Sequence, residues 1–257
     1  MVRGYADMDP SANTGEFVVD ASAGTHAAAA VLMALLYRRR TGRGQLIELP
    51  SSQATFGYFA HSFMERTMAG RTPSTLGNRD AAALQGCYPC RGEDRWIVIT
   101  LADDRHWEAL RRALGDPEWA RLPEFQDHAG RYRNHDALDR HISDWTRERE
   151  HREAMRVLQE AGVPAGAVLD ARDAVEDPHL GARGFYQEAT TADTGTYRYP
   201  SAPFRLSETP ARVRRGPVML GQDNEYVYKE VLGLSDDEYA ELVREGHIGT
   251  EFRSDIP

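Results

Sequence analysis

Residues 20–45 read DASAGTHAAAAVLMALLYRRRTGRGQ, which is the strongest structural signal in the chain. Ala, Leu and Met are good helix formers, and the arginines at 38–40 suit the negative end of a helix dipole. Gly42 is placed for a left-handed C-terminal cap. We therefore predict a helix from Asp20 to about Arg40. Its apolar residues occur on every side, a pattern typical of a helix that is buried on every side.

The carboxylate at the start of this helix has two interpretations. An Asp directly before a helix is usually an N-cap. The helix N-terminus also favours the ionised carboxylate, and Gly24, one turn later, leaves room for a ligand to approach. His26 adds a titratable neighbour. An ionised carboxylate beside small residues is what nucleophilic carboxylate catalysis requires, so both interpretations of Asp20 stay open on the residues alone.

Helical and strand-like segments alternate along the rest of the chain, which favours an α/β or α+β fold. We predict helices at 50–68, 103–115, 135–146, 150–161, 171–175 and 235–245, the last capped by Ser235. Strands are predicted at 17–19, 45–49, 96–101 and 167–169, with a β-rich region at 185–218. Residues 117–133 are expected to be irregular, with Leu122 and Phe125 as apolar anchors.

Composition excludes several classes of function. The chain has 257 residues, of which 41% are hydrophobic, and its formal net charge is −9. That charge disfavours a nucleic-acid partner, because phosphate binding needs clustered cations. The apolar run at 27–37 is shorter than the roughly 20 residues that span a bilayer, and it lacks the positive start of a signal peptide. We therefore expect a cytoplasmic protein without membrane contact.

The two cysteines form a CxxC pair, Cys87 and Cys90. Two cysteines cannot build a disulfide scaffold. The pair lacks a second CxxC at zinc-ribbon spacing and does not open a helix as a thioredoxin-type pair does. We interpret both residues as small buried hydrophobes and expect no metal site. The common nucleotide, zinc-protease and hydrolase motifs are also absent from the sequence.

Several segments together resemble the class III CoA-transferase family, also called CaiB/BaiF. This family includes formyl-CoA transferases, carnitine CoA-transferases and α-methylacyl-CoA racemases. The matching segments are 20–26, 32–36, 38–45, 76–78, 87–90, 161–166, 177–179, 183–184, 202–207, 220–221 and 224–225. Each motif is modest by itself, but their number and order extend the resemblance over nearly the whole chain.

The resemblance implies an α/β fold with a Rossmann-like large domain and a small α+β domain. Residues 1–70 and 195–257 would contribute to the large domain, 85–180 would form the small domain, and 71–84 and 181–194 would be linkers. An N-terminal Rossmann-like half, which holds most CoA contacts in the family, is expected to come from a separately encoded chain. The two chains are expected to form an interlocked heterotetramer.

In the family's transferases, the residue matched by Asp20 is the nucleophile. The resemblance therefore implies transfer of CoA between carboxylic acids through an aspartyl anhydride and an aspartyl-CoA thioester. Gly24, Asn78 and Gln85 are expected to contact coenzyme A. Residues 80–85 (DAAALQ) replace the glycine-rich loop of formyl-CoA transferases, which predicts a different lid and a different acyl preference.

Two alternatives remain open. One is an acyl-CoA racemase or isomerase subunit in which Asp20 is an acid or base, although the histidine of the racemase branch has no counterpart here. The other is a non-catalytic subunit that binds a full-length paralogue. The family's Gly-Glu-His-Asn motif reads GQDN at 221–224, so a histidine is missing there as well.

Overall fold

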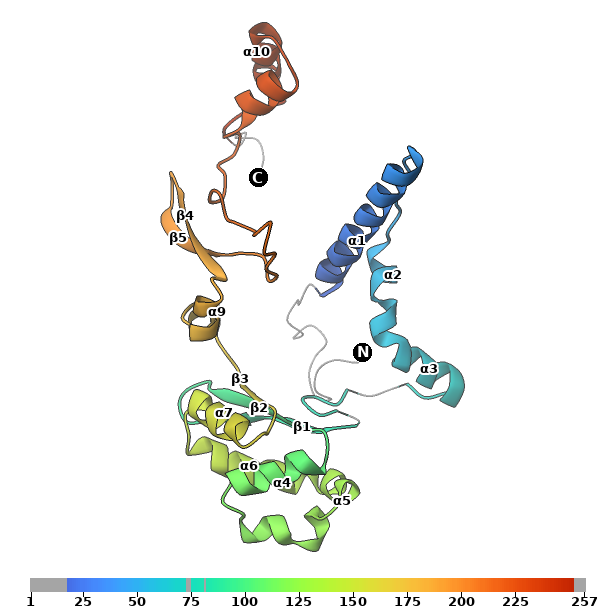
Figure 1. Ribbon diagram of the computed structural model, residues 1–257, viewed down its shortest axis with the longest axis vertical. Coiled ribbons are helices and arrows are strands. Elements are labelled where there is room, and N and C mark those ends of the chain that lie inside the picture. Colours follow the sequence, from blue (N-terminus) through green and yellow to red (C-terminus); the bar gives the residue numbers. More distant parts are fainter. Residues whose placement is uncertain (1–17, 73–74, 81, 252–257) are drawn as a thin grey trace. The chain divides into compact units, whose positions relative to one another are not determined.

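The computed structural model describes residues 18–72, 75–80 and 82–251 (Figure 1). They divide into a unit that ends at Val168 and a unit that begins at Leu169. The first unit contains a helical segment, α1 to α3, and a helix–sheet domain. The second contains a β-hairpin and a C-terminal helix.

The helical segment begins with α1 (Val18–Thr41). It continues through α2 (Ser51–Phe56), a 3-10 turn (Gly57–Phe59) and α3 (Ala60–Ala69). Gly42 has φ 74°, which confirms the predicted left-handed cap. The strand predicted at 17–19 is wrong for its last two residues, which are helical, while Phe17 lies outside the described residues.

The strand predicted at 45–49 is also wrong, because this segment is an irregular connection between α1 and α2. Its alternating QLIEL pattern fits a strand, but a strand is stable only when it is paired in a sheet. No partner strand pairs with it in the described part of the chain. Leu46 is consequently 92% exposed.

α1 is exposed, contrary to the burial predicted from its sequence. Leu32 and Met33 are 67% and 64% exposed, and only 6% of the most apolar stretch is buried. Within the described residues, α2 packs against one side of α1. With a mean hydropathy of 1.4 over an 18-residue stretch, Val19–Thr41 is long and apolar enough to cross a membrane, a test that core helices of soluble proteins also pass.

The helix–sheet domain is built on a three-stranded antiparallel sheet in the order β1-β2-β3. Its strands are β1 (Leu84–Pro89), β2 (Trp96–Leu101) and β3 (Ala165–Ala167). Cys87 lies opposite Val98, and Gly166 lies opposite the same residue on the other side. The strand predicted at 96–101 is confirmed.

Four helices and two 3-10 turns complete this domain. The helices are α4 (Asp104–Ala113), α5 (His128–Arg133), α6 (His135–Arg147) and α7 (His151–Glu160), and the turns are Glu118–Arg121 and Pro123–Phe125. Alternate residues of β2 and one face each of α4, α6 and α7 form the core: Ile97, Ile99, Leu101, Trp107, Leu110, Leu138, Ile142 and Leu158. Phe125 is buried as predicted, whereas Leu122 is largely exposed between the two turns.

The second unit contains short helices α8 (Ala171–Val175) and α9 (Pro178–Ala182), followed by an antiparallel hairpin of β4 (Tyr186–Thr191) and β5 (Gly195–Pro200). A π-helical stretch (Tyr226–Val231) precedes α10 (Asp236–Arg244). Ser235 caps α10 in a capping box, which confirms that prediction. The predicted β-rich region ends early, since 201–218 are irregular.

Candidate functional site

Asp20 lies in the first turn of α1, with its side chain exposed. The N-cap interpretation is wrong, because Val18 and Val19 already belong to the helix and Asp20 follows them. Within the described residues, no hydrogen bond or ion pair engages its carboxylate. Asp20 is therefore available to a reacting molecule.

Gly24 lies on the same helix face as Asp20, one turn further along. A Cβ atom built at Gly24 would meet nothing within 4 Å. A glycine inside a helix is less stable than an alanine by roughly 0.5–1 kcal/mol. Since no described contact requires the glycine, its small size leaves open space beside Asp20.

A set of contacts holds this part of α1 against α2. Ser22 is buried, and its Oγ lies 3.4 Å from the carbonyl oxygen of Ala54 and 3.4 Å from Tyr58 Oη. His26 Nδ1 lies 2.8 Å from the carbonyl oxygen of Ser22. His26 follows Asp20 by six residues, about 240° around the helix, so the structure does not bring the two side chains together.

Asn78 and Gln85 are the other predicted CoA contacts. Asn78 precedes β1, next to the helix–sheet domain, and Gln85 lies on β1 within it. Asn78 lines a depression of about 530 Å³ together with Thr75, Leu76, Gly77, Arg79, Gly86, Cys87, Tyr88, Asp139 and Ser143. Gln85 is not among these lining residues. It is half-buried on β1, where its Oε1 lies 3.5 Å from Thr100 Oγ1.

A polar cluster beside this depression was not predicted from the sequence. Arg79 Nη2 donates to Asp136 Oδ1 at 2.5 Å and to Asp139 Oδ2 at 2.6 Å. Tyr88 Oη donates to Asp139 Oδ1 at 2.9 Å, and His135 Nε2 lies 3.5 Å from the same oxygen. The cluster joins residues more than 50 positions apart, so no local sequence pattern could reveal it.

The charges of the cluster follow from burial and pairing. The hydrogen bond from Arg79 holds the pKa of Asp136 below its ordinary value. Burial, with Asp139 nearby, raises the pKa of Tyr88 far above its ordinary value, so this phenol stays protonated. Burial lowers the pKa of His135. The cluster fastens the loop next to Asn78 onto α6, which gives it a positioning role.

Neither cysteine of the CxxC pair resembles a reactive thiol. Cys87 is half-buried, and desolvation raises its pKa. Desolvation, followed by the nearby charge of Glu150, raises the pKa of buried Cys90 to about 11. Both thiols are therefore protonated at neutral pH and weakly nucleophilic. Within the described ranges, no cluster of three or more His, Cys, Asp or Glu side chains is suited to hold a metal ion.

The chain matches the sequence model of CoA-transferase family III over residues 1–224. It is 30% identical over 242 residues to the succinyl-CoA–D-citramalate CoA-transferase of Chloroflexus aurantiacus, which covers 94% of this chain and 60% of that protein. It is 27% identical over 260 residues to a formyl-CoA:oxalate CoA-transferase of Rhodopseudomonas palustris, covering 93% and 61%. The chain thus spans about three fifths of the length of these curated relatives.

The fold is also similar to a solved structure. A CaiB/BaiF family protein from Brucella suis superposes with a TM-score of 0.74 at 23% identity, covering 90% of this chain and 59% of that one.

Proposed function

Because the chain belongs to CoA-transferase family III, we propose that it transfers CoA between carboxylic acids with Asp20 as the nucleophile. The family predicted from the motifs is confirmed by the family match, and the α/β class is confirmed by the match and the structural likeness. One observation carries the choice of nucleophile. Asp20 is an exposed carboxylate in the first turn of a helix, unpaired within the described residues, next to the open space at Gly24.

In the proposed reaction, an Asp20 oxygen attacks the thioester carbonyl of the donor acyl-CoA. The C–S bond breaks, leaving an acyl-aspartyl anhydride and CoA thiolate. The thiolate attacks the Asp20 carbonyl of the anhydride, which releases the donor acid and forms an aspartyl-CoA thioester. The acceptor carboxylate then attacks that thioester, whose C–S bond breaks to leave an acceptor-aspartyl anhydride and CoA thiolate. The thiolate attacks the acceptor carbonyl of this anhydride, which forms the new acyl-CoA and releases the Asp20 carboxylate. Each exchange conserves an activated acyl bond, provided that water is excluded.

The chain's own residues would serve this reaction in distinct ways. Ser22, held by its contacts with Ala54 and Tyr58, would fix the turn that carries the nucleophile. Gly24 would allow the thioester to approach the helix backbone. Asn78 would contact CoA from the depression that it lines, and Gln85 stays a predicted CoA contact.

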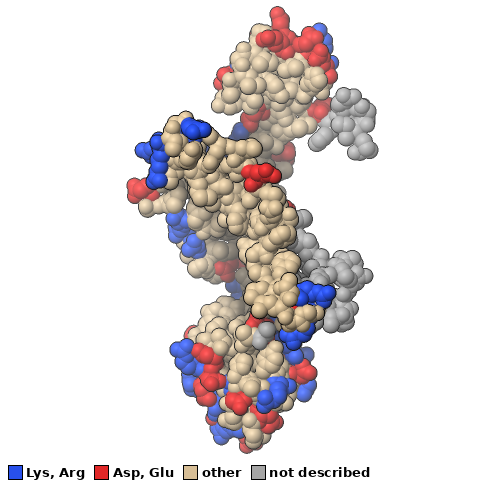
Figure 2. Space-filling model, turned by 90° about the vertical axis from the view of Figure 1, so that its right-hand side faces the viewer, with Lys and Arg blue, Asp and Glu red and all other residues tan. Residues whose placement is uncertain are grey.

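We further propose that a separately encoded N-terminal half completes the fold by covering α1. In Figure 2 the surface over α1 to α3 is mostly uncharged, with few acidic or basic groups, whereas both charge types cover the helix–sheet domain in the lower part of the view. Large apolar side chains of α1 and α3 are exposed on it, among them Leu32, Met33, Phe63 and Met68, and contiguous exposed apolar surface is typical of a protein interface. Two copies of each chain would form the heterotetramer, and the reaction would take place in the cytoplasm.

The direct test is a transfer assay on the assembled protein, with succinyl-CoA or formyl-CoA as donor and D-citramalate or oxalate as acceptor. Asp20→Asn should abolish the formation of new acyl-CoA, because an amide cannot form the anhydride. Glu48→Gln removes an exposed carboxylate after α1 and should leave the rate unchanged.

Other outcomes would contradict the proposal. Full activity in Asp20→Asn would exclude Asp20 as the nucleophile and favour a non-catalytic subunit. Exchange of the acyl α-proton with deuterated solvent, without any acceptor acid and without transfer, would favour a racemase or isomerase.

A further inference from the structure

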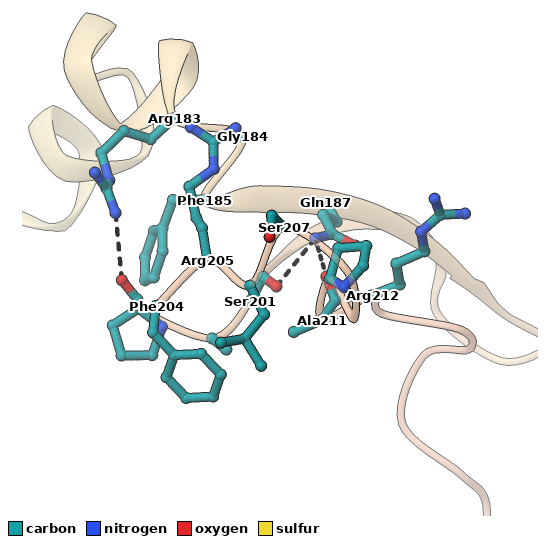
Figure 3. Close-up of a pocket in the computed structure, with 14 residues that line it drawn as sticks. Arg183, Gly184, Phe185, Gln187, Ser201, Phe204, Arg205, Ser207, Ala211 and Arg212 are labelled. Atoms are coloured by element: carbon teal, nitrogen blue, oxygen red, sulfur yellow. Dashed lines mark hydrogen bonds between the residues drawn. The ribbon is translucent and has the colours of Figure 1, made fainter.

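A pocket of about 640 Å³ in the second unit is lined by arginine side chains and by no acidic side chain (Figure 3). All 14 of its lining residues belong to the described part of the chain, and none of them is Asp or Glu. Three are arginines: Arg183 at the end of α9, and Arg205 and Arg212 in the irregular segment after β5. The volume falls in the range of small-molecule sites.

The three guanidinium groups lack acidic partners. Arg183 Nη2 donates to the carbonyl oxygen of Pro203 at 3.3 Å, as Figure 3 shows, and within the described ranges no carboxylate pairs with any of the three. Other arginines of this chain do pair, among them Arg215 with Asp223 at 2.7 Å and Arg111 with Asp116 at 2.8 Å. Some other arginines, such as Arg198, are also unpaired in the described residues, but the three at this pocket are distinctive because they line one cavity that contains no Asp or Glu.

Hydrogen bonds give the pocket a defined shape. Gln187, on β4, donates from Nε2 to Ser201 Oγ at 3.0 Å and to the carbonyl oxygen of Ala211 at 3.4 Å. Its Oε1 accepts from the backbone N–H of Val213 at 2.8 Å. One side chain thus ties β4 to Ser201 before Arg205 and to Ala211 and Val213 on either side of Arg212.

Apolar groups line the same pocket. Phe204 and Leu206 are 59% and 50% exposed, and Phe185 is half-buried. Figure 3 shows Arg183 and Arg205 at the α9 end of the pocket, with Phe204 beside them and Arg212 at the opposite end. A ligand that fits both features carries an anionic group and a flat or apolar group.

We propose that this pocket binds an organic phosphate. The phosphate would lie at Arg183 and Arg205, and the organic group would lie against Phe204 and Leu206. Arginine donors match phosphate oxygens in bidentate geometry, and several unpaired arginines favour a dianion over a single carboxylate. The proposal does not depend on Asp20, because every lining residue lies beyond Leu169.

Titration calorimetry on the assembled protein tests this proposal with adenosine monophosphate and CoA as ligands and adenosine as the phosphate-free control. Arg205→Gln and Arg183→Gln should each weaken phosphate-ligand binding about tenfold or more, since a charge-assisted hydrogen bond contributes roughly 1.5–3 kcal/mol. Arg198→Gln is the matched control, because Arg198 is an exposed arginine of β5 outside the pocket. Melting curves verify that each variant is folded.

The two ligands identify the source of the phosphate. Weaker binding of CoA in the pocket variants would place a CoA phosphate here, and weaker binding of adenosine monophosphate alone would indicate a separate phosphorylated ligand. Either result supports the proposal. Equal affinity in wild-type protein and both folded pocket variants for both ligands would overturn it, as would an equal loss in Arg198→Gln. If Asp20 proved not to be the nucleophile, these titrations would be unaffected.

Discussion

No described contact explains why a glycine occupies position 24. It destabilises α1 relative to alanine, yet a Cβ at this position would meet no atom within 4 Å. Because Gly24 lies one turn from Asp20, we propose that its small size serves the close approach of CoA or the partner chain to this part of α1.

Gly24→Ala should therefore lower the transfer rate of the assembled protein tenfold or more without lowering its melting temperature. Gly57→Ala is the matched control, because Gly57 is also helical, with φ −59°, and has no atom near its missing Cβ. That control should keep full activity. Unchanged transfer in Gly24→Ala would remove the evidence for close approach at this turn.

His135 gives the helix–sheet domain a pH dependence of known sign. Burial lowers its pKa in the folded state, and Asp139, Asp136 and Arg79 are the charged groups that act on it. Between the folded value and the ordinary value of 6.5, the unfolded chain binds more protons, so stability falls as pH decreases through 6.5. Carboxylates whose pKa is lowered in the folded state, such as Asp136, stabilise the fold at higher pH. They lose this contribution to the free energy of unfolding only as the pH falls below about 3.8.

We expect the free energy of unfolding, followed by tryptophan fluorescence in urea, to decrease from pH 7 to pH 5. His135→Gln should show a smaller decrease. A titration of the His135 ring by NMR in the wild-type protein gives an independent value. A folded-state pKa above 6.5 would contradict the prediction.

At the scale of elements, sequence reasoning succeeded where the determinants are local. α10 begins directly after its predicted N-cap Ser235, and α1 ends before the predicted C-terminal cap Gly42, because caps depend on residues within one turn. The predicted strand at 45–49 is wrong because a strand needs a neighbouring strand to pair with. The segment 117–133 was expected to be irregular, but it contains α5, which Asp127 caps at its N-terminus. The cluster of Arg79 with Asp136 and Asp139 required the tertiary fold.

α1 itself illustrates the difference between propensity and burial. Its composition correctly predicted a helix, but apolar composition alone cannot show whether the described chain buries that helix. For the candidate site, the sequence pattern predicted that Asp20 and Gly24 belong to one helix. The role of Asp20 as nucleophile came from the family resemblance. The helix position of Asp20 and the open space at Gly24 required the structure.

Polar substitution on α1 tests what covers it. Leu32→Gln with Met33→Gln should prevent assembly with the partner while the rest of the chain keeps its helicity, because both side chains are already exposed in this chain. Leu46→Gln, at a more exposed leucine outside the helix, should assemble normally. Co-purification and circular dichroism measure the two properties. Normal assembly of the double variant would place the interface elsewhere.

At the scale of the whole molecule, the chain covers about three fifths of its curated relatives, and its longest apolar helix is exposed. We expect the chain produced alone to form aggregates or non-native oligomers, because water does not solvate such a surface stably. Co-production with the complementary half should give one defined heterotetramer by size exclusion with light scattering. A cooperatively melting monomer of the chain alone would contradict the need for a partner.

The central claim is that Asp20 forms a covalent intermediate. Its most direct measurement is to trap the assembled protein with hydroxylamine during turnover of succinyl-CoA, digest it, and locate the hydroxamate by mass spectrometry. We expect modification of the peptide that contains Asp20, dependent on acyl-CoA and absent from Asp20→Asn. A modification found on the partner chain only, or none at all while transfer proceeds, would show that Asp20 is not the nucleophile.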